Sequence, residues 1–176
     1  GQTVPQFHGD LDVGFALPWQ HSSVWLRSSA GLANGDRSSA ISNFYFGGFG
    51  NNYVDDKSIK RYREFGALPG FGIDEVSAMN YLRELAEWNL PPYVFESMGT
   101  PGFYLTWLRP SLFAAGLWSD PGNAALRSER TSVGGQVDLS FIVLHRYSMT
   151  LSAGAAIGYQ ASHRAGSEWM VSLKIM

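Results

Sequence analysis

Cysteine, charge and long apolar runs are scarce or missing in this sequence, and each shortage excludes a class of protein or site. None of the 176 residues is cysteine, which excludes disulfides, thiolate catalysis and zinc-thiolate sites. No apolar stretch approaches the roughly 18 to 20 residues of a transmembrane helix, which excludes a helical membrane protein. Charged residues make up 16% of the chain, against roughly 25% in a typical soluble domain. Something other than water is therefore expected to face much of the surface.

The net charge and the first residues set two further limits. The formal net charge is −2 and the isoelectric point is about 6.1, so nucleic acid is not expected as a partner. The opening GQTVPQFHGD has neither a basic nor an apolar region, and no signal peptide is expected within it. We expect either that a leader has been removed or that these residues continue a longer polypeptide.

Apolar side chains alternate with polar or small ones along much of the chain. The last ten residues are the clearest case: Trp169, Val171, Leu173 and Ile175 stand at every second position, and Glu168, Ser172 and Lys174 lie on the other face. Since successive side chains of a strand point to opposite faces, this pattern predicts strands with one apolar and one polar face. Seven strands are predicted, at residues 7–17, 23–33, 79–90, 103–118, 133–144, 148–160 and 167–176, and the fourth of them is apolar on both faces.

Two properties of these strands favour a barrel in a lipid bilayer over a soluble β-sandwich or a lipocalin-like barrel. In residues 148–160 the positions opposite the apolar face hold only small or polar residues, which fits a polar lumen better than a packed core. The scarcity of charge favours the same environment. The predicted fold is therefore all-β: one domain over residues 1–176 that forms an antiparallel transmembrane β-barrel of about seven to eight strands in the bacterial outer membrane.

The third and fourth predicted strands are less regular than the others. Residues 79–90 place the lumen candidates Arg83 and Glu87 on the inward face. The same register points Glu84 toward lipid, so we expect either a bulge there or a position near the membrane interface. The fourth predicted strand contains Pro110, which a fully paired central strand does not accept easily.

About forty residues rich in glycine and aromatics, 34–76, separate the second and third predicted strands. Loops this long in a compact domain are usually functional or disordered. The aromatic residues argue against disorder. We interpret Gly47, Gly48 and Gly50 as turn glycines and not as a phosphate loop, because no Lys-Ser or Lys-Thr pair follows them. The loop is therefore the candidate functional element.

Four short motifs carry a resemblance to a known family. They are NFYFGGF at 43–49, LPGF at 68–71, LAEWNLP at 85–91 and AGLWSD at 115–120. In this order they resemble the C-terminal barrel portion of the BamA superfamily of outer-membrane assembly and translocation barrels, the bacterial surface antigen type. The resemblance implies that the long loop folds back into the lumen through two Gly-aromatic motifs. The motif residues are Gly47, Gly48 and Phe49 in the first and Pro69, Gly70 and Phe71 in the second.

The sequence departs from the family pattern at two places. Pro69 replaces the arginine of the second motif, so the ion pair that this arginine makes in the lumen does not transfer directly, and Arg61 or Arg63 is the candidate substitute. The charged loop residues are expected either to be solvated or to pair with inward residues of the third strand. The chain ends in Met176, where the family usually has an aromatic residue. The C-terminal assembly signal is expected to comprise Trp169, Val171, Leu173, Ile175 and Met176.

The strand count leaves three ways to close the barrel. Seven strands with the long loop outside place the start of the first strand outside as well, which does not make a sensible single-chain barrel. Either the closing strands belong to a longer polypeptide, or an eighth strand lies within residues 42–50, or two chains combine into a larger barrel. We favour a C-terminal barrel segment and keep self-association as an alternative.

The leading hypothesis is a barrel without enzymatic activity that acts in insertion or transport of proteins or other polymers across the outer membrane. Its expected partners are outer-membrane lipid, further barrel strands or a second copy, and a protein client. Two alternatives stay open: a barrel that anchors a separate, tethered soluble domain, and a lipid-modifying enzyme. No cofactor or metal is expected, because alternating polar residues in a lumen-facing strand account for the spacing of His8, Asp10 and Asp12.

Overall fold

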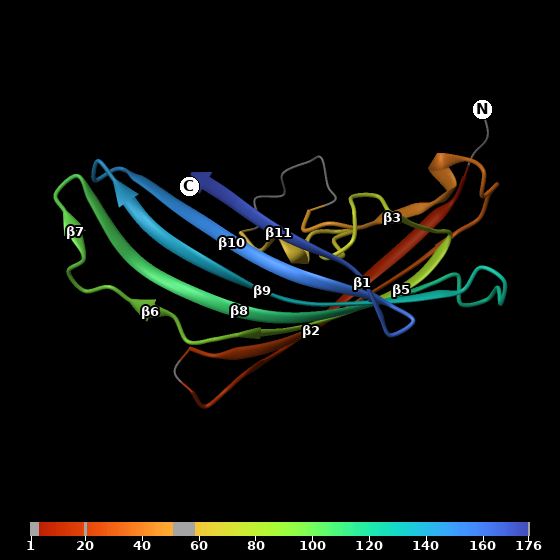
Figure 1. The fold of residues 1–176 in the computed structure, drawn as a ribbon, viewed down its shortest axis with the longest axis horizontal. Coiled ribbons are helices and arrows are strands. Elements are labelled where there is room, and N and C mark those ends of the chain that lie inside the picture. Colours follow the sequence, from red (N-terminus) through yellow and green to blue (C-terminus); the bar gives the residue numbers. More distant parts are fainter. Residues whose placement is uncertain (1–3, 20, 51–58, 176) are drawn as a thin grey trace.

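One antiparallel sheet dominates the computed structural model, which describes residues 4–19, 21–50 and 59–175 (Figure 1). The sheet has nine strands, and the predicted all-β antiparallel fold is confirmed. Two short strands, β6 (Tyr93–Val94) and β7 (Gly99–Thr100), pair with β8. The other strands follow one path: β1 (Gln6–Ala16), β2 (Ser23–Ala33), β5 (Asn80–Asn89), β8 (Phe103–Ser119), β9 (Ser128–Val143), β10 (Tyr147–Gln160) and β11 (His163–Ile175).

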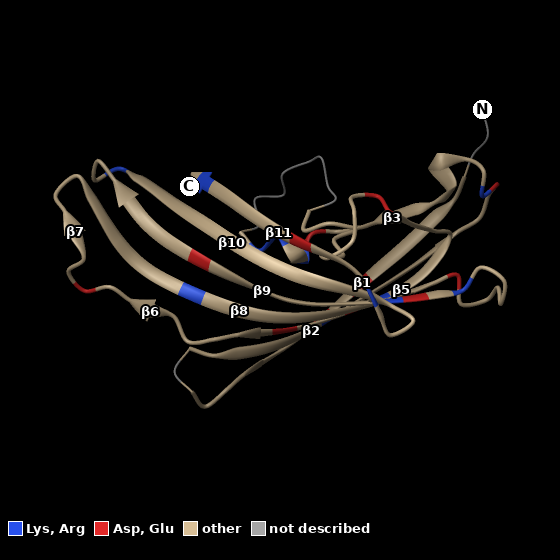
Figure 2. Ribbon diagram, in the orientation of Figure 1, with Lys and Arg blue, Asp and Glu red and all other residues tan. Residues whose placement is uncertain are grey.

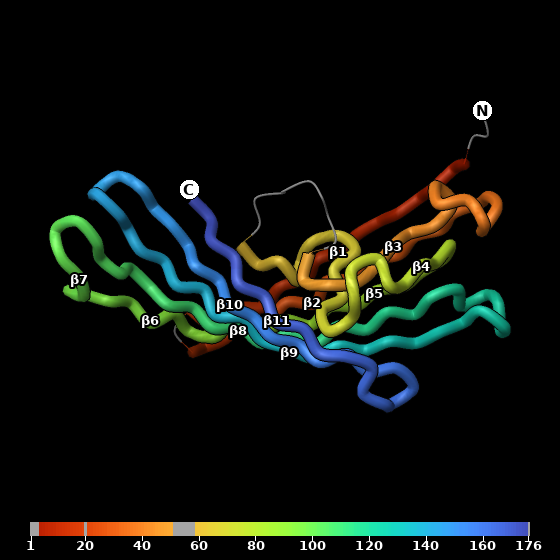
Figure 3. Tube along the Cα trace, turned by 45° about the horizontal axis from the view of Figure 1, so that its top comes forward, coloured from red at the N-terminus to blue at the C-terminus, as the bar shows by residue number. Residues whose placement is uncertain are grey.

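The sheet is curved but not closed (Figure 3). β1 and β11 lie at its two edges, and within the described residues neither has a strand neighbour on its outer side. The predicted closed barrel is therefore not formed by this sheet, because its first and last strands do not pair. All neighbouring strands on the path are antiparallel, so β1 and β11 run in the same direction.

The segment between β2 and β5 lies on the concave face of the sheet (Figures 1 and 3). We call residues 34–76 the inner loop; the structure describes 34–50 and 59–76 of it. The described part of the segment between β2 and β5 forms two 3-10 turns and a two-stranded sheet, namely η1 (Ala40–Ser42), η2 (Arg61–Arg63), β3 (Phe44–Phe46) and β4 (Val76–Ala78).

The pairing of the short strand β3 excludes one of the three predicted ways of closing the barrel. β3 pairs with β4, in the register Phe44↔Ala78 to Phe46↔Val76, and does not join the main sheet. The alternative of an eighth barrel strand within residues 42–50 is therefore wrong. Among the residues that the structure describes, no helix has the length and apolar composition needed to cross a membrane.

The two faces of the main sheet differ in the side chains that they carry. Large apolar side chains are exposed on the convex face; Phe15, Leu32 and Trp169 are 61%, 63% and 78% exposed. Polar side chains are buried on the concave face, where Gln136 and Asp138 are both 1% exposed. Charged residues are sparse along the strands (Figure 2). The alternation in the sequence thus becomes an apolar outer face and an inner face on which buried polar side chains lie beside apolar ones such as Tyr81 and Leu85.

The strand register explains the two irregular positions predicted in β5 and β8. β5 pairs with β2 without interruption, so the bulge expected at Glu84 is absent. Glu84 lies on the convex face and accepts a hydrogen bond from Ser28 Oγ at 2.6 Å. Pro110 lies just beyond the β5–β8 ladder, which begins at Ser111, and its carbonyl accepts the N–H of Leu90. The missing proline N–H therefore costs no hydrogen bond within that ladder.

Candidate functional site

The hydrophobic core lies between the inner loop and the concave face of the sheet. The rings of Phe46 and Tyr81 have centroids 4.7 Å apart, and Tyr62 stacks on Phe113 at 4.3 Å. Because both sides contribute large side chains, the inner loop is part of the folded core and not a solvated excursion. The buried apolar residues are Phe44, Phe46, Phe49, Tyr62, Leu68, Phe71, Val76 and Ala78 from the segment between β2 and β5, and Tyr81, Leu85, Phe113, Ala115, Leu117 and Ala156 from the sheet.

The two Gly-aromatic motifs of the inner loop bind each other through their backbones. The N–H of Gly48 donates to the Phe71 carbonyl at 3.0 Å, and the Gly48 carbonyl accepts the N–H of Leu68 at 3.0 Å. Gly48 and Gly70 have φ values of +69° and +94°, which favour glycine because a Cβ is strained there. Residues 47–49 and 69–71 therefore form one folded unit.

Strand β5 holds the inner loop with two charged side chains. Arg83, which is 5% exposed, donates from Nε to the Ala67 carbonyl and from Nη2 to the Tyr62 carbonyl, both at 3.0 Å. Glu87, which is 1% exposed, accepts a hydrogen bond from Arg63 Nε at 2.7 Å and a second from Arg63 Nη2. Both lumen candidates of β5, Arg83 and Glu87, thus bind the loop, one through the loop backbone and the other through a two-point ion pair.

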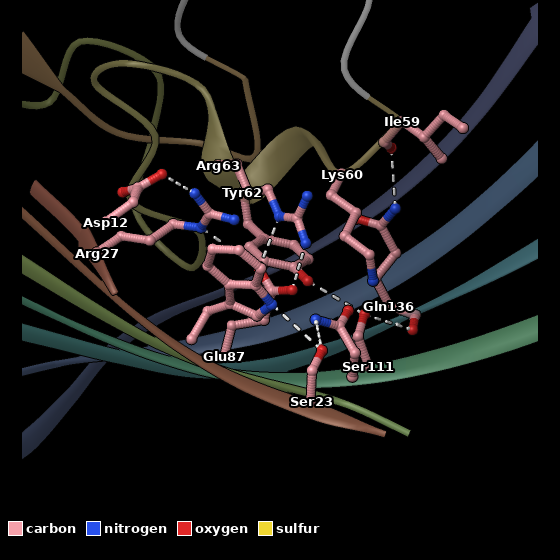
Figure 4. A network of polar contacts seen from close by, with 12 residues as sticks. Asp12, Ser23, Arg27, Ile59, Lys60, Tyr62, Arg63, Glu87, Ser111 and Gln136 are labelled. Atoms are coloured by element: carbon pink, nitrogen blue, oxygen red, sulfur yellow. Dashed lines mark hydrogen bonds and ion pairs between the residues drawn. The ribbon is translucent and has the colours of Figure 1, made fainter. Parts of the chain in front are cut away.

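Arg27 of β2 and Tyr62 of the inner loop extend this polar network (Figure 4). The Arg27 guanidinium pairs with Asp12 of β1, and its Nε lies 3.9 Å from a carboxylate oxygen of Glu87. The Tyr62 hydroxyl donates to Ser111 Oγ of β8 at 3.2 Å. A chain of polar contacts therefore crosses the concave face from β1 to β8.

Burial changes the pKa of loop residues in the network. It lowers the pKa of Lys60 to about 8, although the ammonium group lies 3.7 Å from an Asp138 carboxylate oxygen. It raises the pKa of Tyr62. Burial also disfavours the Arg63 cation, but the hydrogen bond and charge of Glu87 outweigh it and raise the Arg63 pKa. Arg63 therefore stays charged and Tyr62 neutral, whereas Lys60 titrates in the mildly alkaline range.

Strands β10 and β11 hold the inner loop by close approach at glycines. A Cβ on Gly154 would lie 3.0 Å from Phe49 Cε1, and a Cβ on Gly158 would lie 2.7 Å from Phe71 Cε2. A Cβ on Gly166 would lie 2.7 Å from the Gly70 carbonyl oxygen. Of the small residues predicted to line a lumen, Gly154 and Gly158 are packed by loop aromatics, because their missing side chains leave room for the rings.

Glu168 of β11 connects the two Gly-aromatic motifs to the sheet. Its Oε1 accepts the backbone N–H of Phe49 and its Oε2 accepts the backbone N–H of Gly70, both at 3.1 Å. The sequence marked Glu168 only as a polar residue between apolar neighbours of the last strand. Its inward parity, shared with Ser172, is the one signal that pointed toward the concave face.

The remaining predicted residues lie in different places. Of the two candidates for a substitute charge, Arg63 pairs with a strand, whereas Arg61 pairs with Glu64 inside the inner loop at 3.1 Å. Pro69 faces the sheet through its backbone, since its carbonyl accepts a hydrogen bond from Ser132 Oγ. In the last strand Trp169, Val171, Leu173 and Ile175 are exposed on the convex face, and Met176 lies outside the described residues.

Cavities lined by described residues lie beside the inner loop. One of about 280 Å³ is lined by Asp10, Asp12, Arg27, Arg63 and Arg83 among others, and a second of about 820 Å³ by residues that include Lys60, Arg109 and Asp138. Side chains of both charges line each cavity, which suits water and ions better than an apolar ligand. Within residues 4–19, 21–50 and 59–175, no three His, Asp or Glu side chains converge as a metal site.

Comparisons of the chain with models of protein families, with curated proteins and with solved structures found no match. Function is therefore inferred from the two faces of the sheet, its free edges and the inner loop.

Proposed function

We propose that this sheet is part of the wall of an outer-membrane β-barrel that acts in insertion of proteins, or transport of polymers, across that membrane. The observation that carries the proposal is the exposure of large apolar side chains across the whole convex face. Apolar side chains on all seven strands of the path are exposed on the convex face, while polar ones are buried on the concave face. In water such a surface promotes aggregation, but in lipid it is the expected exterior of a barrel.

The free edges of β1 and β11 favour closure by additional strands. Unpaired backbone groups cost several kcal/mol each in lipid, so an open edge must be covered. Because β1 and β11 run in the same direction, a junction between them would be parallel, within one copy or between two equally oriented copies. We favour an odd number of further strands, since this keeps every junction antiparallel, as in the rest of the sheet.

The inner loop supports a lumen that is braced from inside. Its described residues contact β5 through Arg83, β8 through Ser111, β9 through Ser132, β10 through Gly154 and β11 through Glu168. A loop that joins five strands fixes the curvature of the wall. Together with the resemblance to the BamA superfamily, this brace favours assembly or transport over simple anchoring.

The first test asks whether the convex face enters lipid. Val171→Arg places a cation on that face, at a cost of about 2 to 4 kcal/mol near the bilayer midplane. Ser172→Arg, the matched control, places the same charge on the concave face one residue away. We expect the Val171 variant to lose insertion of the full chain into liposomes, measured by flotation and carbonate extraction, and the control to keep it. A chain that stays monomeric in water without detergent would contradict the membrane location.

The second test measures activity. A separate outer-membrane barrel is allowed to fold into liposomes with and without the inserted chain, and we expect faster folding when the chain is present. Conductance across planar bilayers tests transport. Stable insertion without faster client folding and without conductance would overturn assembly and transport and leave the anchoring alternative.

A further inference from the structure

Two backbone donors from distant parts of the inner loop converge on one carboxylate. We propose that the paired Gly-aromatic motifs form a carboxylate-binding site, made of the N–H groups of Phe49 and Gly70, which Glu168 of β11 occupies within the same chain. Each donor faces its own carboxylate oxygen at 3.1 Å. The ligand class is therefore a monocarboxylate bound through both oxygens.

The spacing of the two donors is built into the fold of the loop. The hydrogen bonds of Gly48 with Phe71 and Leu68 fix the first motif against the second, and so fix the distance between the two N–H groups. A carboxylate matches two adjacent donors because each oxygen can accept one of them. An amide of the same size would present its own NH₂ group to one of the donors.

Glycine is needed around this site for steric reasons. Gly48 has a φ of +69°, at which a residue with a Cβ is strained, and a Cβ there would lie 3.0 Å from Ile73 Cγ1. A Cβ on Gly70 would overlap the backbone of Gly158, and one on Gly166 would lie 2.7 Å from the Gly70 carbonyl. The motif glycines thus allow the loop backbone to reach β10 and β11 closely enough to place both donors on the carboxylate.

The charge of Glu168 is balanced by backbone donors. Among the described residues, no Lys or Arg nitrogen lies within 4.0 Å of its carboxylate. Pro69, which precedes the donor Gly70, carries neither a cation nor an N–H. The second motif therefore contributes backbone donors, and the strand contributes the charge.

The test uses the full chain in detergent micelles and needs no client, so its failure and that of the proposed function are distinguishable. Amide hydrogen exchange is measured at Phe49 and Gly70 by NMR. In Glu168→Gln we expect exchange at these amides to be about ten to one hundred times faster, the ratio expected for loss of a charged hydrogen bond. Amides of β10 report whether the sheet stays folded. The matched control is Glu129→Gln, an exposed residue of β9.

Chemical rescue identifies the ligand class. In Glu168→Ala the two donors are left without their acceptor, and added acetate or formate is expected to restore slow exchange at both amides. Chloride at the same ionic strength should not. Unchanged exchange in Glu168→Gln, or equal effects of acetate and chloride in Glu168→Ala with β10 still protected, would overturn the proposal.

Discussion

The inner loop is held in two different ways by the two halves of the sheet. On β5, Arg83 and Glu87 hold it with charged hydrogen bonds from buried side chains. On β10, Gly154 and Gly158 hold it by leaving space for loop aromatics. The contact on β5 requires the charged side-chain atoms of Arg83 and Glu87. The contact on β10 requires that Gly154 and Gly158 have no side chain.

This difference decides how each half can be weakened. A charged contact fails when one partner is removed, because the other is left buried without its counter-charge. A glycine contact fails when atoms are added, because a packed interface has no room for them. Removing atoms should therefore damage the β5 half most, and adding atoms should damage the β10 half most.

The largest effect is expected from truncation of the ion pair on β5. Glu87→Leu leaves Arg63 without its carboxylate. Breaking a buried pair costs about 3 to 5 kcal/mol, and we expect about 3 kcal/mol because the Arg63 side chain is 29% exposed. The free energy of unfolding in denaturant, with the full chain in micelles, measures this loss. Faster tryptic cleavage after Arg61 and Arg63 would report release of the loop.

The double variant Arg63→Leu with Glu87→Leu separates charge from packing. It removes both charges, so we expect it to recover much of the stability lost in Glu87→Leu. If Glu87→Leu unfolds at the same denaturant concentration as the unaltered chain, the ion pair does not hold the loop.

A smaller effect is expected from filling the glycine contact on β10. Gly158→Val adds a side chain where a Cβ would already lie 2.7 Å from the ring of Phe71. Overpacking of this kind costs about 1 to 3 kcal/mol and should displace the second motif from the sheet. Tryptic cleavage of the loop and denaturant unfolding both measure it. Gly122→Val is the matched control, because a Cβ there has no neighbour within 4 Å. Equal losses of stability at the two positions would show that contact with Phe71 is not the cause.

The alternation of side chains along each strand is what allowed the face of each strand residue to be predicted from the sequence. Alternation is local in sequence, so it gave the convex positions such as Trp169 and the inward positions of Arg83 and Glu87. Parity also showed that β10 presents small residues to the concave face. It does not tell whether water or side chains fill the space in front of them, since that depends on the path of the loop.

Contacts between distant segments could not be predicted in the same way. Phe49 and its acceptor Glu168 are 119 residues apart, and the bond uses a backbone N–H that every residue except proline carries. No residue pattern marks such a donor. The same holds for the edge strands β1 and β11. Alternation predicts that they are strands, but it does not predict which strand pairs with each of them.

The smallest predicted effect is a change of stability with pH that arises from the charge of Lys60 in the inner loop. Its pKa is lowered from 10.5 to about 8 in the folded chain, so between these values the unfolded chain binds more protons. Stability should therefore rise with pH from about 8 to 10.5, by about 1 kcal/mol between pH 7 and pH 9. Denaturant unfolding at these two pH values measures the rise. Lys60→Met should abolish it, because the ionising group is gone, whereas Lys174→Met on β11 should retain it. A rise of equal size in Lys60→Met would assign the pH dependence to another group and leave packing as the role of this side chain.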